Sequence, residues 1–89
     1  MIGRCAVYEG RVQSVGFRHW LKESALGFEV TGWVRNLVDG RVELMIYGVD
    51  SEVNEYLRAV ENGQMRGAIR RFEVHAVKWV ACRDFQILP

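Results

Sequence analysis

The residues best suited to chemistry stand near the start of the chain, in the stretch Gly10-Arg-Val-Gln-Ser-Val-Gly-Phe-Arg18. This stretch follows a strand-like segment and leads into the first turn of an amphipathic helix. A glycine-containing loop at a helix start offers free backbone N–H groups and the positive end of the helix dipole. Arg18 adds a planar guanidinium that can bind two phosphate oxygens at once. The stretch therefore predicts a phosphate site built from the amides of residues 12–18 and Arg18.

A second candidate residue, Asn36, ends a β-rich segment and precedes the turn signal Asp39-Gly40. A carboxamide accepts a hydrogen bond through its oxygen and donates through its nitrogen, which suits a residue that orients a water. Taken alone, Asn36 is as easily a turn former. Arg18 alone is as easily a surface arginine, although a cation in a first helical turn opposes the dipole. Together with the loop between them, the two residues favour a functional site.

The elements that must position these residues follow from the spacing of apolar side chains and from turn signals. In chain order we expect a strand at 3–10, a helix from Phe17 that Gly27 stops, strands at 30–37 and 41–47 around the Asp39-Gly40 turn, a helix that Asp50 or Ser51 caps and that ends near Gly63, a long strand at 68–80, and a short strand at 84–88.

This β-α-β-β-α-β order with a short C-terminal strand predicts an α+β fold, the ferredoxin-like two-layer sandwich. Its sheet is antiparallel or mixed, with both helices on one face. The first two strands run parallel in this fold, so the loop and Asn36 are expected at the same edge of the sheet. The predicted core is apolar and comprises Phe17, Trp20, Leu21, Val42, Leu44, Ile46, Val53 and Leu57.

The opposite face of the sheet is predicted to carry an apolar patch of Met45 and Tyr47, which Trp33 and Trp79 can join. RNA-recognition domains share this topology and place aromatic residues on that face. The third strand lacks the glycine and aromatic pattern of such domains. A surface for self-association, or one covered by a lid, is the simpler interpretation.

Length and charge limit the classes of function. The chain has 89 residues, which we expect to form one domain over 1–89, and a net charge of +1. A nearly balanced charge argues against a dedicated nucleic-acid or membrane-surface binder. With no secretion signal or membrane span in the sequence, we expect a cytoplasmic protein. Cys5 and Cys82 lack metal-site spacing and are expected to be reduced, with a disulfide between them as the lesser alternative.

Two separated motifs resemble those of one family. The stretch from Gly10 to Arg18 resembles the signature loop of the acylphosphatases, and Gly32-Trp-Val-Arg-Asn36 with Asp39-Gly40 resembles their second motif. The terminal Asp84-Phe85-Gln86-Ile87 is similar to the family's last strand. The resemblance implies hydrolysis of a small-molecule acyl phosphate to carboxylate and phosphate, without metal or cofactor. We expect a monomer that can self-associate weakly through the apolar face of its sheet.

The resemblance also implies the role of each site residue. The backbone amides of Gln13, Ser14, Val15, Gly16, Phe17 and Arg18 hold the phosphate together with the Arg18 guanidinium. Asn36 positions the attacking water, and the phosphate of the substrate takes the proton. His19 adjoins Arg18, but successive side chains on a helix diverge by about 100°, so we expect no catalytic role for it. His75, in mid-strand, is likewise expected to be structural or solvent-facing.

Two other functions remain open at this stage. One is a non-catalytic ferredoxin-like binding module, because this fold supports many unrelated activities. The other is an acyl-phosphate-binding domain with weakened catalysis.

Ser14 stands where the family pattern has glycine. If this position needs a positive φ, serine costs on the order of 1–2 kcal/mol; with a negative φ the cost is small, and the hydroxyl can donate to phosphate. We expect an active enzyme with weakened phosphate affinity. Comparing acyl-phosphate turnover of the wild type and Ser14→Gly tests this, and equal turnover would show that the serine is harmless.

Overall fold

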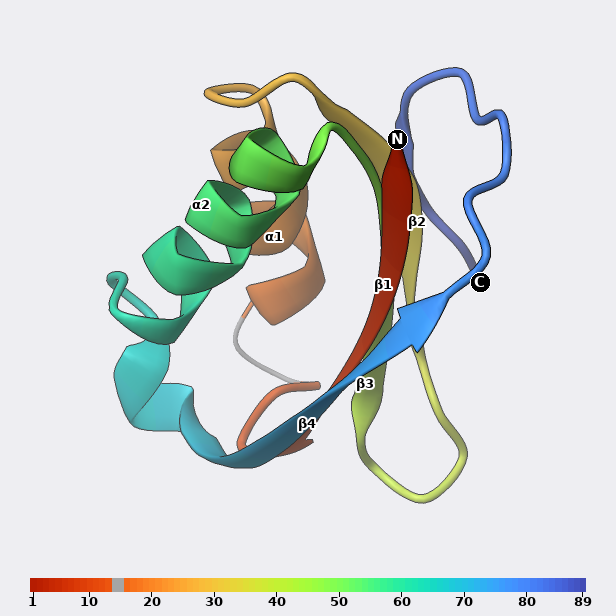
Figure 1. The fold of residues 1–89 in the computed structure, drawn as a ribbon. Helices are drawn as coiled ribbons and strands as arrows, with labels where there is room; N and C mark the ends of the chain where they lie inside the picture. The colour runs from red at the N-terminus through yellow and green to blue at the C-terminus, as the bar shows by residue number, and fades with distance from the viewer. Residues whose placement is uncertain (14–15) are drawn as a thin grey trace.

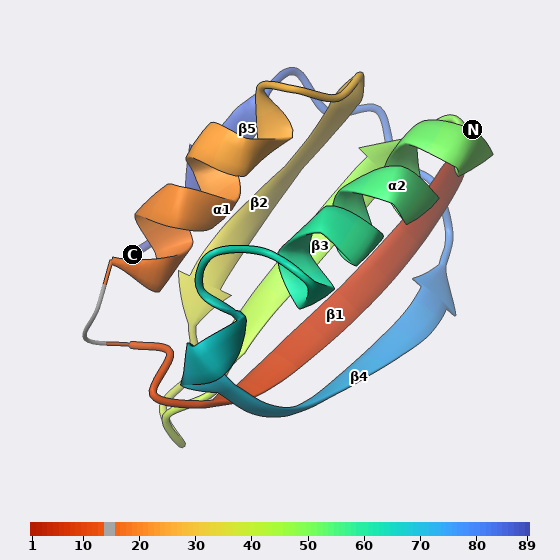
Figure 2. The same cartoon turned by 90° about the vertical axis from the view of Figure 1, so that its left-hand side faces the viewer.

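The computed structural model describes residues 1–13 and 16–89. Its elements are β1 (Ile2–Gly10), α1 (Phe17–Ala25), β2 (Val30–Asn36), β3 (Val42–Gly48), α2 (Asp50–Glu61), a short 3-10 helix (Arg66–Ala68), β4 (Ile69–Val77) and β5 (Phe85–Ile87). Both helices cover one face of a single sheet (Figures 1 and 2). The fold is the predicted ferredoxin-like α+β sandwich. No helix in the described ranges is long and apolar enough to cross a membrane.

The strand order places the site elements at one edge of the sheet. The order is β4-β1-β3-β2-β5. β3 lies between β1 and β2 and pairs antiparallel with both, so β1 and β2 run in the same direction. β5 pairs parallel with β2, which makes the sheet mixed. The loop after β1 and Asn36 at the end of β2 therefore emerge from the same end of the sheet, as predicted.

The core lies between the sheet and the two helices, where the sequence pattern places it. α1 contributes Phe17 and Leu21, and α2 contributes Val53 and Leu57, all of them buried. Val42, Leu44 and Ile46 line the inward face of β3 and are fully buried. Trp20 is only partly buried and packs at the margin of this cluster. Burial of these side chains fixes both helices on the sheet and, with them, the start of α1.

The prediction that Asp50 or Ser51 caps α2 is wrong. Val49 occupies the N-cap position without a side-chain hydrogen bond, and Asp50 is already the first helical residue. The Asp50 carboxylate accepts a hydrogen bond from Asn54 one turn later instead of from a backbone N–H. Asp50 and Glu52 still lie in the first turn, where their negative charge favours the helix dipole.

The last long strand is shorter than the sequence pattern predicts. β4 covers Ile69–Val77, after the 3-10 turn, and residues 78–84 form no strand. The reason is topological, because β4 and β5 lie at opposite edges of the sheet. The segment 78–84 must cross the face without helices to reach β2 (Figure 1). It docks there through Asp84, whose carbonyl accepts a hydrogen bond from the Gly32 N–H at 2.9 Å.

Tyr47 belongs to the face without helices, as predicted, but it is only 7% exposed. Gly3 lies opposite Tyr47 on β1, and a Cβ at Gly3 would stand 3.0 Å from the tyrosine ring. The missing side chain lets the ring lie against β1. Cys82 of the crossing segment and Cys5 lie close enough to help burial raise the pKa of Tyr47. The crossing segment runs over this same face (Figure 1), where the Cys82 thiol lies 3.9 Å from the Gly32 carbonyl of β2. Both thiols are free.

Two buried tyrosines offer a matched test of stability. The Tyr8 hydroxyl is buried with no hydrogen-bond partner in the described part of the chain, whereas the Tyr56 hydroxyl donates to the Leu21 carbonyl at 2.8 Å. An unpaired buried hydroxyl is costly, while a paired one stabilises by about 1 kcal/mol. We expect Tyr8→Phe to raise the free energy of unfolding by about 1 kcal/mol and Tyr56→Phe to lower it by a similar amount. Urea denaturation measures both, and equal losses would contradict the assignment.

Candidate active site

The loop after β1 ends in a glycine with a special backbone conformation. Gly16 is the N-cap of α1, with φ 76° and ψ 23°. A Cβ at this position would meet nothing within 4 Å, so glycine is needed for the conformation and not for space. Ser14 and Val15 lie outside the described residues, and the sign of φ at Ser14 therefore stays a matter for the Ser14→Gly comparison.

The start of α1 is held against the sheet by an aromatic contact. Phe17 is 1% exposed, and its ring meets that of Tyr8 edge-on with 5.5 Å between ring centroids. Tyr8 belongs to β1, two residues before the loop begins. The Phe17 side chain is therefore core, as predicted, while its backbone N–H belongs to the first turn of α1. This contact fixes the helix terminus that the sequence analysis assigns to phosphate binding.

Arg18 is half-buried and tied to the C-terminal segment. Its Nη1 donates to the Leu88 carbonyl at 3.2 Å, and the Leu88 N–H donates to the Val34 carbonyl of β2 at 2.8 Å. Leu88 thus joins Arg18 to the strand that carries Asn36. Within residues 1–13 and 16–89, no other acceptor or carboxylate engages the guanidinium, so most of its five donors are available to a ligand. The sequence gives no sign of this contact, because the acceptor is a main-chain carbonyl 70 residues away.

Asn36 is the last residue of β2 and carries a buried polar atom. It pairs with Val42 of β3, and its Oδ1 is buried without a hydrogen-bond donor among the described residues. A buried carbonyl oxygen without a donor costs about 1–3 kcal/mol. A donor brought by a ligand or a bound water would remove that cost. The site end of β2 therefore presents an acceptor suited to a water molecule.

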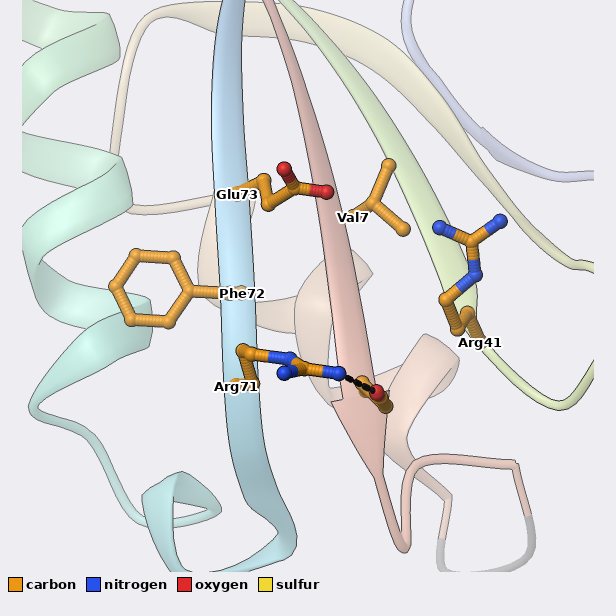
Figure 3. Close-up of a pocket in the computed structure, with 6 residues that line it drawn as sticks. Val7, Arg41, Arg71, Phe72 and Glu73 are labelled. Atoms are coloured by element: carbon orange, nitrogen blue, oxygen red, sulfur yellow. Dashed lines mark hydrogen bonds and ion pairs between the residues drawn. The ribbon is translucent and has the colours of Figure 1, made fainter.

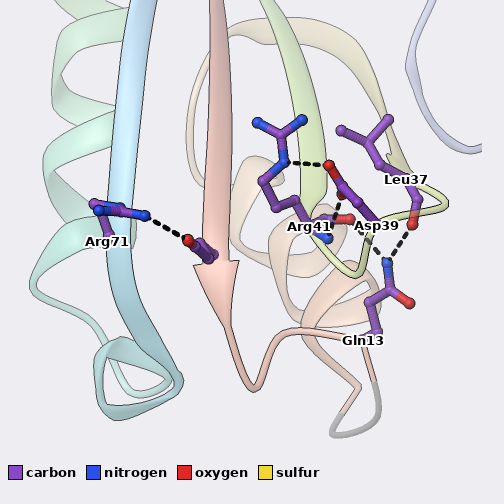
Figure 4. A network of polar contacts seen from close by, with 6 residues as sticks. Gln13, Leu37, Asp39, Arg41 and Arg71 are labelled. Atoms are coloured by element: carbon purple, nitrogen blue, oxygen red, sulfur yellow. Dashed lines mark hydrogen bonds and ion pairs between the residues drawn. The ribbon is translucent and has the colours of Figure 1, made fainter.

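Gln13 connects the loop directly to the β2–β3 turn. Its Nε2 donates to the carbonyls of Leu37 and Arg41, both at 2.8 Å (Figure 4). The first of these acceptors follows Asn36 in the chain. The structure therefore brings the loop, Arg18 and Asn36 to one end of the sheet, through Gln13 on one side and Leu88 on the other. The sequence motif predicts a role only for the backbone N–H of Gln13, and nothing in it indicates these two contacts of the side chain.

The two histidines lie outside this arrangement. His19 is exposed and stands 3.6 Å from Glu23, one turn along α1. His75 is exposed in the middle of β4, opposite Cys5 of β1. Neither makes a hydrogen bond to the described residues of the loop.

A separate hollow of about 280 Å³ opens on the face without helices (Figure 3). Two arginines line it, but Arg71 pairs with Glu9 at 2.9 Å and Arg41 pairs with Asp39 at 2.8 Å. Glu73 adds a further negative charge to its wall. Since its cations are already paired, this hollow suits a phosphate dianion less well than the loop and Arg18 do.

Comparison with known proteins gives the family of the chain. The acylphosphatase family model matches residues 5–87. An acylphosphatase of Mesorhizobium japonicum is 38% identical over 80 residues, covering 89% of this chain and 85% of the relative. One of Chlorobaculum tepidum is 35% identical over 83 residues, covering 92% and 90%. The crystal structure of acylphosphatase from Bacillus subtilis superposes with a TM-score of 0.90 at 30% identity and covers both chains fully. The chain belongs to the acylphosphatase family.

Proposed function

We propose that this protein hydrolyses acyl phosphates and that Arg18, the amides of residues 12–18 and Asn36 carry out the reaction. The substrate is a mixed anhydride of a carboxylic acid and phosphoric acid, which is already activated. The protein therefore needs mainly to position the reactants and to stabilise charge.

In this proposal the phosphate group binds between the loop and α1. The N–H groups of the loop and the first helical turn point at its oxygens, and the helix dipole favours its negative charge. The Arg18 guanidinium binds two of those oxygens, because Leu88 engages only Nη1 and the fork remains available. As the bond to the acyl oxygen breaks, these donors stabilise the charge on the transferred group.

Asn36 orients the attacking water in the same proposal. Its Oδ1 accepts a hydrogen bond from the water and directs the water oxygen at phosphorus, opposite the acyl oxygen. The P–O bond to the water forms while the bond to the carboxylate breaks. Neither Arg18 nor Asn36 can accept a proton at neutral pH, so the water proton passes to the phosphate. The products are a carboxylate and dihydrogen phosphate, which balances atoms and charge.

One observation supports this assignment more than any other, namely the buried Oδ1 of Asn36 at the site end of β2, which has no hydrogen-bond donor among residues 1–13 and 16–89. A merely structural asparagine before a turn would pair its oxygen with the turn backbone. Here the N–H groups of Leu37, Gly40 and Arg41 donate to other acceptors within the turn, and the Asn36 acceptor is left for a ligand.

The experiment measures hydrolysis of benzoyl phosphate by the purified protein in the presence of a chelator. The loss of the substrate's ultraviolet absorbance reports the reaction. Turnover that persists in the chelator and is competitively inhibited by inorganic phosphate is expected. A correctly folded protein that binds phosphate but gives no turnover would contradict hydrolysis and favour a catalytically weakened domain.

A further inference from the structure

The side chain of Gln13 joins two halves of the site that are distant in sequence. A primary amide carries two hydrogens, and here each hydrogen has its own carbonyl acceptor, one from Leu37 and one from Arg41. Figure 4 shows Nε2 pointing into the turn from below, with the Gln13 oxygen directed away from it. The donor is in the loop that is assigned to phosphate, and one acceptor lies next to Asn36.

The turn that receives Gln13 is ordered by contacts of its own. The Leu37 N–H donates to the Arg41 carbonyl at 2.8 Å, and the Gly40 N–H donates to the Leu37 carbonyl at 3.1 Å. Asp39 accepts hydrogen bonds from the backbone N–H of Arg41 at 3.1 Å and from its Nε at 2.8 Å. These contacts lower the pKa of Asp39, led by the backbone N–H of Arg41. These contacts within the turn therefore hold in place the two carbonyls that accept hydrogen bonds from the Gln13 amide.

The loop itself has few other attachments in its described part. The Arg11 N–H donates to the Ala68 carbonyl at 2.9 Å, and the Val12 side chain is buried. Between Val12 and Gly16, Gln13 is the described residue that ties the loop to another element. Its side chain contacts the turn, so it takes no part in binding the phosphate itself.

We propose that Gln13 is a positioning residue that fixes the phosphate loop relative to Asn36 by clamping the loop to the β2–β3 turn. The inference rests on the proposed roles of the loop and Asn36. In-line attack requires the water and the bound phosphorus to keep one relative position, and a displacement of about 1 Å can cost about a hundredfold in rate. A clamp between their two supports limits that displacement.

The test is the substitution Gln13→Met, which keeps the length of the side chain and removes both donors. Gln64→Met is the matched control, because Gln64 is an exposed glutamine with no side-chain hydrogen bond in the described structure. For each variant we would measure kcat and KM with benzoyl phosphate, the inhibition constant of inorganic phosphate, and the urea midpoint of unfolding. We expect Gln13→Met to lower kcat by about tenfold to a hundredfold. Phosphate inhibition should change by less than about threefold, and the urea midpoint should match that of Gln64→Met.

Two results would overturn the clamp. An unchanged kcat would show that the contact is dispensable, and a parallel loss of kcat, phosphate affinity and urea midpoint would show a general structural role. Gln13→Glu, which has the same shape but cannot donate, should reproduce the loss of kcat and also weaken phosphate inhibition through its negative charge. Failure of the proposed site is a different result, because it would appear as wild-type turnover in Arg18→Ala or Asn36→Ala.

Discussion

Replacement of Arg18 by alanine is expected to lower kcat/KM for benzoyl phosphate by about a thousandfold. Among the residues that the structure describes, the Leu88 carbonyl engages one donor of the guanidinium, and the other donors are available for phosphate oxygens. Its loss removes a charge-assisted bidentate contact from both the bound substrate and the transition state. Inhibition by inorganic phosphate should therefore weaken together with turnover. Steady-state kinetics with phosphate as inhibitor measure both effects.

Two further variants separate the chemistry of Arg18 from its charge and its place on the helix. Lys22→Ala removes an exposed cation from the last turn of the same helix and should leave kinetics unchanged. Arg18→Lys keeps the charge but loses the planar fork, so its kcat/KM should lie between those of the wild type and Arg18→Ala. Wild-type turnover in Arg18→Ala, with the fold intact by circular dichroism, would remove Arg18 from the site.

Replacement of Asn36 by alanine is expected to lower kcat by about a hundredfold or more while phosphate inhibition changes by less than about threefold. The carboxamide is assigned to the water and not to the phosphate, so the anion site should survive. The same substitution removes a buried oxygen that has no donor in the described structure. We therefore expect the free energy of unfolding to stay level or rise by about 1 kcal/mol. A fall in kcat together with an unchanged or higher free energy of unfolding is the response expected of a residue that supports catalysis at a cost in stability.

Asn54→Ala is the matched control for Asn36, since Asn54 lies exposed on α2 and its side chain donates a hydrogen bond to Asp50 of the same helix. It should leave kcat unchanged. If Asn36→Ala instead lost kcat and phosphate affinity by the same factor, Asn36 would belong to the phosphate contacts and the assignment of the water would be wrong. If it lost stability along with activity, Asn36 would be a structural residue of the turn.

Much of the fold follows from local patterns. The spacing of apolar residues predicts which side of each element is buried. The structure confirms this for the helix from Phe17 to Ala25 and for the alternating Val42, Leu44 and Ile46 of β3. The Asp39-Gly40 turn fixes the antiparallel pairing of β2 and β3 for the same local reason. Patterns of this kind need only neighbouring residues, so one sequence is enough to read them.

The contacts that differ from expectation depend on distant parts of the chain. β4 ends at Val77 because the following segment has to reach the opposite edge of the sheet, which no pattern within 68–80 records. Tyr47 can lie against β1 because its neighbour across the sheet is Gly3, which has no side chain. The cap of α2 is the exception, because the difference there is local: Asp50 is already helical, and its carboxylate accepts a hydrogen bond from Asn54 one turn later.

The sequence by itself predicts which residues are the candidates for chemistry in this protein, namely the glycine loop, Arg18 and Asn36, and it predicts the sheet edge where they emerge. Residue type and element order suffice for that, because donor chemistry is local and strand direction follows from topology. Only the tertiary structure decided how these groups are held, through the Leu88 carbonyl on Arg18 and the turn carbonyls on Gln13. Main-chain carbonyls are the same in every residue, so their partners become visible only once the chain is folded.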